Sequence, residues 1–330
     1  MPIPNRTPRT LLGRRALALL AVPAFALAAC GGGGGDAFEE ATATSDAAAG
    51  GDAGSLTVGG ADFTEMKIMQ SMYELLLEEA GYTIDVKTVG QREVYTPSLE
   101  SGEIDVVPEY AATMAEYLNR EENGPEAEPI STNDVAETVE AMTPLAEARG
   151  LTVLEPSQAL DANGFYVTKD FAEENDLTTL SDLAALGQPV TLAAGDECLE
   201  RVFCALGLEE TYGIDIAGVT GDDFGSATGK QKVVDGDAQL GLSGTTDGTL
   251  EGLGLVVLED DKELQAADNL VPIVNTESAG DEQVAKTLNS LAEVLTTEDL
   301  TNLNSQVDGE RLLPEDVARD YLTEKGLIDG

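Results

Sequence analysis

Between residues 55 and 154 the hydrophobic positions follow strand spacing and helical spacing in turn. The strand-like runs are residues 55–60, 82–86, 104–107 and 151–154. After the first run, apolar side chains recur every three or four positions, at Ile68, Met69, Met72, Tyr73, Leu76 and Leu77. We expect this helix to have its N-cap at Thr64 and to stop at Gly81, and further helices near 94–101, after Tyr110 and at 133–149. Repeated β-α-β units predict an α/β fold with a largely parallel, doubly wound sheet.

A second series of the same kind follows Asp161. Its expected strands are residues 165–168, 190–194, 216–219, 239–242, 255–258 and 270–274. Its expected helices are residues 180–186, 199–210 and 230–234, followed by three closing helices at 282–295, 297–304 and 314–325. Two α/β lobes of similar size are implied. Because ligands of such open sheets sit at the carboxyl ends of the strands, two facing lobes predict a site in the cleft between them.

The first thirty residues have the zones of an export signal. Four arginines, at Arg6, Arg9, Arg14 and Arg15, precede an apolar run at 16–29. That run is too short to cross a hydrocarbon core of roughly 30 Å, so residues 1–29 are interpreted as a cleaved signal peptide. Its end, Leu27-Ala28-Ala29-Cys30, resembles the lipobox of bacterial lipoproteins, in which the cysteine is lipidated. The alternatives are an ordinary secretory signal with a chance cysteine, and export through either the general or the twin-arginine route.

Residues 30–54 follow as a stretch rich in glycine, alanine and aspartate, with no periodicity and little to bury. Such a segment is expected to be a flexible tether. The predicted location is therefore outside the cell, lipid-anchored through Cys30 to the outer face of the cytoplasmic membrane.

The charge balance is strongly acidic, with 62 acidic against 18 basic residues and a net charge of −44. Nucleic acid and anionic lipid headgroups are therefore poor partners. We interpret the acidity as a solvated surface suited to high salt or acidic conditions. Histidine and tryptophan are absent from the sequence, which removes Ser-His-Asp and Cys-His nucleophiles and histidine metal sites. We therefore expect a protein that is not an enzyme and uses no cofactor and no metal.

Two further cysteines, Cys198 and Cys204, are six positions apart. In an exported chain such a pair predicts a disulfide, since a metal pair would require two more soft ligands. A glycine-rich segment from Gly225 to Lys230 looks like a phosphate loop, but its spacing is one residue short and Gln231 replaces the magnesium-binding Ser or Thr. We therefore expect no nucleotide site there.

Several short segments, in order along the chain, resemble the substrate-binding protein of the glycine betaine/choline (quaternary amine, osmoprotectant) ABC importers. They are Gly59 with Phe63-Thr64-Glu65; residues 99–105 running into Pro108-Glu109-Tyr110; Lys169-Asp170-Phe171-Ala172; Thr211-Tyr212-Gly213; Thr246-Asp247-Gly248; and Asn302-Leu303-Asn304 with Val307. The resemblance spans residues 55–328. It implies a type II periplasmic-binding-protein fold, with two doubly wound lobes, a ligand cleft and two crossovers.

The same resemblance implies the division of the chain and its partners. The first lobe would comprise residues 55–158 and 272–330, and the second lobe residues 159–271. The lobes would close on a small zwitterionic or cationic ligand, such as glycine betaine, carnitine or choline, and deliver it to an ABC permease with its ATPase. We expect a monomer.

A trimethylammonium group is held by aromatic faces, whereas a betaine carboxylate needs an arginine and hydroxyl donors. By resemblance, Tyr110 and Tyr212 match aromatic positions, Thr113 matches the hydroxyl that meets the carboxylate, and Arg201 falls near an arginine directed into the cleft. The alternative, purely structural roles are packing within a lobe for the two tyrosines and a surface ion pair for Arg201. We add Thr246, from the Thr-Asp-Gly segment, to the expected ligand-binding set.

The chain also departs from the family pattern. Ala61 replaces a lysine of many relatives, and Asn163, Lys230 and Gly244 stand near cage positions where relatives have aromatic residues. Phe165, Tyr166 or Tyr95 would then have to replace the missing aromatic faces. Alternatively the ligand is another small zwitterion, such as an amino acid derivative, with hydrogen bonds from Asn163 and Gln91. A two-lobed exported enzyme and a sensor without transport are the remaining alternatives.

Overall fold

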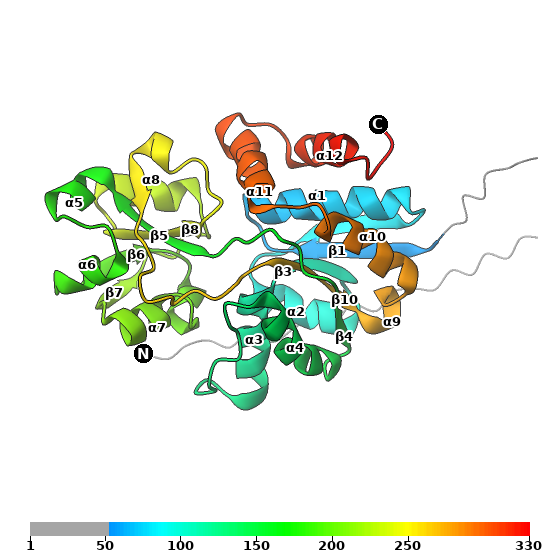
Figure 1. Ribbon diagram of the computed structural model, residues 1–330, viewed down its shortest axis with the longest axis horizontal. Helices are drawn as coiled ribbons and strands as arrows, with labels where there is room; N and C mark the ends of the chain where they lie inside the picture. The colour runs from blue at the N-terminus through cyan, green and yellow to red at the C-terminus, as the bar shows by residue number, and fades with distance from the viewer. Residues whose placement is uncertain (1–52) are drawn as a thin grey trace, which may run out of the picture. The chain divides into compact units, whose positions relative to one another are not determined.

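The computed structural model describes residues 53–330, and these form the fold in Figure 1. The expected signal peptide, Cys30 and nearly all of the expected tether lie outside the described residues. Within residues 53–330 the strands form two sheets of five strands each. We call the part built on each sheet the first lobe and the second lobe. Among the helices of this part of the chain, none is long and apolar enough to cross a membrane.

The first sheet has the strand order β2-β1-β3-β10-β4. Its strands are β1 (Ser55–Gly60), β2 (Thr83–Thr88), β3 (Val106–Tyr110), β4 (Leu151–Val153) and β10 (Leu270–Asn275). β1 is parallel to β2 and β3, whereas β10 is antiparallel to β3 and β4. The sheet is therefore mixed, because β10 enters from the second lobe and not through a helix that returns along the first sheet.

Helices cover both faces of the first sheet (Figure 1). On one face lie α1 (Thr64–Glu79), α10 (Glu282–Ala292), α11 (Thr297–Asn304) and α12 (Pro314–Lys325). On the other lie α2 (Arg92–Ser101), α3 (Ala111–Asn123) and α4 (Val135–Glu147), with the short α9 (Thr276–Ala279) after β10. The central strands β3 and β10 are buried at every position, as expected for strands covered on both faces.

One end of α1 differs from the expectation. The N-cap is Phe63, and Thr64 is the first helical residue. The Thr64 hydroxyl donates to Asp308 Oδ1 at 2.6 Å, so it is used for a contact with a distant segment. The consequence is that α1 starts one residue earlier than expected and has Phe63 at its N-terminus.

The second sheet has the order β7-β6-β8-β5-β9. Its strands are β5 (Asn163–Thr168), β6 (Val190–Ala193), β7 (Ile216–Val219), β8 (Leu240–Gly244) and β9 (Leu255–Val257). β6 is parallel to β7 and β8, and β5 is antiparallel to β8 and β9. Its helices include α5 (Lys169–Glu174), α6 (Leu180–Ala185) and α8 (Ala227–Asp235), with the short turn η3 (Glu251–Leu253).

The prediction of one helix at 199–210 is wrong. This region contains the 3₁₀ turn η1 (Asp196–Glu200), one turn of helix α7 (Ala205–Gly207) and the wider turn η2 (Leu208–Tyr212). The expected disulfide between Cys198 and Cys204 is confirmed, with the two Cα atoms 5.2 Å apart. Cys204 has a non-helical backbone, so the crosslinked segment cannot continue as one helix.

Two chain segments connect the lobes and run antiparallel to each other. Leu160 and Asn269 form a bridge pair, and the Asp161 N–H donates to the Asp268 carbonyl at 3.2 Å. β10 begins at Leu270, so the boundary expected between residues 271 and 272 falls inside a strand of the first sheet. The side chains on these two segments therefore lie where the lobes meet.

Candidate ligand-binding site

A cavity of about 310 Å³ lies between the lobes. The first lobe contributes residues from the start of α1, from α2 and from the junction of β3 and α3. The second lobe contributes the segment 197–203 and Phe224. The volume is at the lower end of the range for small-molecule sites, which suits a ligand of few atoms.

Aromatic side chains from both lobes line this cavity: Phe63, Tyr95, Tyr110, Tyr117, Phe203 and Phe224. The Phe63 ring lies 6.3 Å from the Tyr110 ring, nearly parallel to it, and 5.1 Å from the Phe224 ring. Phe63 and Tyr110 belong to the first lobe and Phe224 to the second. Aromatic faces are thus brought together across the cleft.

Tyr110 ends β3 and lines the cavity, as the sequence led us to expect. Its hydroxyl donates to Glu65 Oε1 at 2.7 Å, and only 7% of the residue is exposed. Burial raises the pKa of Tyr110 well above its usual value, which keeps the ring neutral. The ring is therefore fixed in position by its hydroxyl.

Arg92 was not among the residues expected from the sequence. It lies in the first turn of α2 and forms a buried, two-pronged ion pair with Glu109, with Nε–Oε1 and Nη2–Oε2 distances of 2.8 and 2.6 Å. Arg92 Nη2 also donates to the Thr113 hydroxyl at 2.8 Å. Arg92, Thr113 and Ala61 all line the cavity. A guanidinium therefore lines the same cavity as Ala61.

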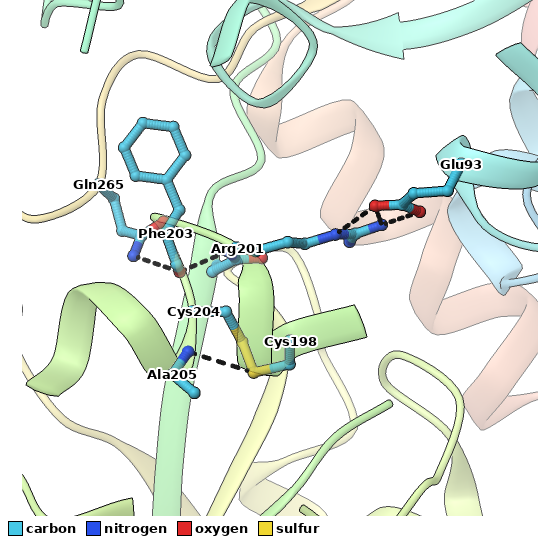
Figure 2. Close-up of a disulfide and its surroundings, with 8 residues drawn as sticks. Glu93, Cys198, Arg201, Phe203, Cys204, Ala205 and Gln265 are labelled. Carbon is cyan, nitrogen blue, oxygen red and sulfur yellow. Dashed lines mark hydrogen bonds and ion pairs between the residues drawn. A yellow bond between two sulfur atoms is a disulfide. The ribbon is translucent and has the colours of Figure 1, made fainter. Parts of the chain in front are cut away.

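Arg201 extends from the second lobe to the first (Figure 2). Its Nη2 lies 2.9 Å from Glu93 Oε2, and its Nε lies 3.2 Å from Glu93 Oε1. The two side chains are 30% and 43% exposed. Arg201 therefore lines the cavity and also forms a partly exposed ion pair. The structure thus contains both the cavity contact and the ion pair that the sequence offered as alternatives for Arg201.

Two buried carboxylates, Asp161 and Asp268, face the cavity from the two connecting segments. Asp161 Oδ1 accepts from the Thr246 N–H at 2.9 Å, and Asp268 Oδ1 accepts from the Thr113 N–H at 3.0 Å. Among the described residues neither carboxylate has an ion-pair partner within 4.0 Å. Burial raises the pKa of Asp268 to about 7 and the pKa of Asp161 well above its usual value. A cation placed beside either carboxylate would therefore stabilise its ionised form.

Sequence reasoning missed these two aspartates because acids are abundant along the whole chain. A usable signal was their place at the ends of the segments that connect the lobes. The feature that distinguishes them is burial, since each residue is only 6% exposed. Burial without a counter-ion is rare for aspartate and marks candidate functional groups.

Thr246 is placed beside the cavity and not among its lining residues. Its hydroxyl donates to Glu65 Oε2 at 2.7 Å, and Asn304 Nδ2 donates to the same oxygen at 2.7 Å. Glu65 also accepts the Tyr110 hydroxyl. This buried network connects the second lobe to α1 and α11 of the first lobe, so Thr246 joins the lobes.

Three residues of the expected ligand-binding set are instead in the core of the second lobe: Phe165, Tyr166 and Tyr212. Phe165 and Tyr166 are consecutive in β5 and pack into separate apolar clusters, because neighbouring side chains of a strand point to opposite faces. The Tyr212 hydroxyl donates to Asp260 and accepts from the Lys262 N–H. None of the three lines the cavity, so they do not replace missing cage faces.

The remaining departures also have structural reasons. A Cβ at position 244 would lie 2.3 Å from Asp161 Oδ2, so Gly244 makes room for the buried carboxylate. Lys230 is buried beside Asp247, with an Nζ–Oδ2 distance of 2.5 Å. Asn163 lines the cavity, and its Nδ2 donates to the Phe203 carbonyl at 2.9 Å. Tyr95 and Gln91 line the cavity as well.

Comparison with known proteins gives a consistent result. A family model described as the substrate-binding domain of ABC-type glycine betaine transport systems matches residues 54–324. The glycine-betaine-binding protein of Pseudomonas aeruginosa is 27% identical over 284 residues, which cover 83% of this chain and 89% of that protein. The glycine betaine-binding protein YehZ of Escherichia coli is 28% identical over 274 residues, which cover 80% of this chain and 88% of YehZ.

The solved structure of apo YehZ is also similar in three dimensions. It matches with a TM-score of 0.57 and 26% sequence identity, covering 82% of this chain and 99% of its own. The two mixed sheets described above are thus the two lobes of a periplasmic-binding-protein fold. The family model matches most of the chain, and the chain therefore belongs to the family of substrate-binding domains of ABC-type glycine betaine transport systems.

Proposed function

We propose that the cavity between the lobes binds a quaternary ammonium compound, of the class of glycine betaine, carnitine and choline. The observation that carries this proposal is that aromatic rings from both lobes share one small cavity with two buried carboxylates, which have no ion-pair partner within 4.0 Å among residues 53–330. Aromatic faces and unpaired carboxylates both attract a cation that has no hydrogen-bond donor. Each aromatic face contributes about 0.5–2 kcal/mol to such binding.

The cation would lie among Phe63, Tyr110 and Phe224, with Asp161 and Asp268 beside it. These rings and carboxylates come from both lobes and from the segments between them. Ligand binding would therefore stabilise a closed arrangement of the lobes, since a ligand favours the state that it contacts more extensively.

A ligand that carries a carboxylate would direct it to Arg92 and Thr113. The Arg92 guanidinium already has Glu109 as one partner, and Thr113 lies within hydrogen-bond distance of it. Arg92 would thus take the part of the family lysine that is absent at Ala61. An uncharged hydroxyl, as in choline, would find hydrogen-bond partners among the same groups.

We further propose that the protein works outside the cell with an ABC permease and its ATPase. Lipid on Cys30 and the glycine-rich tether would keep it near the permease at a high effective concentration. Replacing Cys30 by Ala should release the protein from the membrane fraction while leaving ligand binding unchanged. Membrane retention of the Cys30→Ala protein would contradict the proposed anchor.

The binding proposal is tested by thermal unfolding and calorimetry of the full-length chain with glycine betaine, carnitine and choline. At one hundred times the Kd, a ligand should stabilise the protein by about 2.7 kcal/mol. Phe63→Ala should weaken this effect, whereas Tyr212→Phe, outside the cavity, should leave it unchanged. A response to an amino acid derivative and to none of the three amines would overturn the proposed ligand class.

A further inference from the structure

We propose that the Cys198–Cys204 disulfide is a positioning element of the ligand site, which holds Arg201 and Phe203 in the second-lobe side of the cavity. This inference rests on the function proposed above. It assigns the crosslink a part in ligand affinity, in addition to any contribution to folding.

The crosslinked segment supplies much of the second-lobe side of the cavity. Between the two cysteines, Arg201, Val202 and Phe203 are consecutive lining residues, and Glu197 and Glu200 also line the cavity. Its own backbone hydrogen bonds are of turn type, such as the one from Arg201 N–H to the Cys198 carbonyl at 3.3 Å. It belongs to neither sheet, so its shape depends on other restraints.

The two cysteines provide a fixed base for this segment. Both are 1% exposed and pack in the apolar core of the second lobe. Cys198 Sγ accepts from the Ala205 N–H at 3.3 Å, on the far side of the crosslink (Figure 2). The ends of the segment are therefore held together within the core, while its middle residues face the cavity.

The far end of the segment is held by side chains. The Phe203 carbonyl accepts from Asn163 Nδ2 at 2.9 Å and from Gln265 Nε2 at 3.0 Å. Arg201 reaches Glu93 of the first lobe, the neighbour of Arg92 in α2 (Figure 2). The crosslink therefore lies between the core of the second lobe and the residues that meet the first lobe at the cavity.

Without the crosslink, the segment would have to be ordered when the ligand binds. Ordering side chains and backbone at a binding site lowers affinity, and a pre-organised segment avoids this cost. A purely stabilising role fits less well, because the sequence separation is only 6 and short loops give the smallest stabilisation by crosslinking. The position of the crosslink at the cavity therefore favours a role in shaping the ligand site.

The experiment compares the full-length wild-type chain, oxidised and reduced with a phosphine, with the Cys198→Ser/Cys204→Ser variant. Calorimetry measures the Kd for glycine betaine, carnitine and choline, and thermal unfolding measures the Tm without ligand. We expect the Kd to rise at least tenfold on loss of the crosslink. The matched control is Leu183→Ala in α6, which is buried in the same core but lies outside the cavity. It should lower the Tm and change the Kd less than twofold.

A Kd within twofold of the oxidised wild type in the crosslink-free proteins, or an equal loss of affinity in Leu183→Ala, would overturn the inference. A ligand-independent measurement separates this inference from the proposed function. Hydrogen exchange of the amides at 199–203 should be at least tenfold faster in the reduced protein, with the strands of the second sheet unchanged. Equal exchange rates in the oxidised and reduced forms would contradict the positioning role, whether or not the wild type binds any of the three amines. Failure of the wild type to bind all three amines would by itself overturn only the proposed ligand class.

Discussion

The two sides of the cavity are built in different ways. On the first-lobe side, Phe63, Arg92 and Tyr110 lie at the ends of regular elements, α1, α2 and β3. On the second-lobe side, Arg201 and Phe203 lie in a turn, and their segment is held by a disulfide and by amide side chains. The first lobe thus presents a site formed by its core, whereas the second lobe presents one that needs local restraints.

The two arginine pairs show the same contrast. The Arg92–Glu109 pair is inside the first lobe, with side-chain exposures of 8% and 0%. The Arg201–Glu93 pair connects the lobes, with exposures of 30% and 43%. A buried pair is fixed because separating it leaves a charge without a partner, whereas a partly exposed pair exchanges readily with water. The first suits a permanent part of the site, and the second suits a contact that breaks when the lobes open.

The largest expected effect tests the buried pair. Arg92→Met should lower the free energy of unfolding by about 3–5 kcal/mol, because Glu109 is left buried and uncompensated. Denaturant unfolding measures this loss. The matched variant Arg201→Met should cost no more than about 1 kcal/mol, since its partner is partly exposed. Equal losses would remove the distinction between the two sides.

The next effect concerns the aromatic faces. Tyr110→Ala should weaken binding of a quaternary amine by about 0.5–2 kcal/mol, and Phe224→Ala by a similar amount, because each removes one aromatic face. Calorimetry measures the Kd of each variant. Tyr166→Phe is the control, since Tyr166 is buried in the second-lobe core and outside the cavity. If Phe224→Ala leaves the Kd unchanged, the second lobe contributes no face to the cation.

The third effect is the pH dependence of binding. Burial raises the pKa of Asp268 to about 7, although the Thr113 N–H and Arg92 act against this shift. A bound cation favours the ionised carboxylate, so binding displaces a proton below that pKa. Affinity for choline should therefore rise as the pH increases from about 5.5 to 8. The rise should be at most about tenfold per pH unit if binding displaces one proton.

Asp268→Asn is the test of that assignment. It should lower the affinity for choline at pH 8 and make the affinity less dependent on pH. Glu109 and Arg92, whose charges act on Asp268, and Asp161, which lines the same cavity, remain in the variant. An unchanged pH profile in Asp268→Asn would show that Asp268 is not the group that makes binding depend on pH.

The smallest effect concerns the contact between the lobes. Glu93→Gln should raise the Kd by less than about fivefold, because partly exposed ion pairs contribute about 0–1 kcal/mol. The loss should disappear at high salt, since screening already weakens such a pair. A calorimetric series in increasing sodium chloride measures it. A loss that persists at 1 M salt would mean that Glu93 acts through something other than its charge.

Much of the architecture could be predicted from local patterns. The strand at 216–219 and the helices at 297–304 and 314–325 have the predicted bounds, because periodicity and turn residues act within a few positions of each other. The crosslink between Cys198 and Cys204 was predicted from proximity in the sequence. Tyr110 was placed at the end of a strand, and it lines the cavity. Short-range order is what a linear sequence records most directly.

The site was decided by long-range contacts. Phe165 and Tyr166 are aromatic and close to Asn163 in sequence, yet packing places both in the core. Arg92, Phe224 and the two aspartates have no local pattern that distinguishes them from other residues of their type. Asp161 and Asp268 approach each other only because the two connecting segments pair, and Arg92 becomes a site residue only because Glu109 holds it in the core.

By itself, then, the sequence determined the elements, their α/β order and the crosslink, since these depend on interactions between near neighbours. Tertiary structure decided which aromatic rings and which charges share the cavity. The physical reason is that burial and the pairing of charges depend on the whole fold, so the same residue type is a solvated surface group in one place and a buried carboxylate lining the cavity in another.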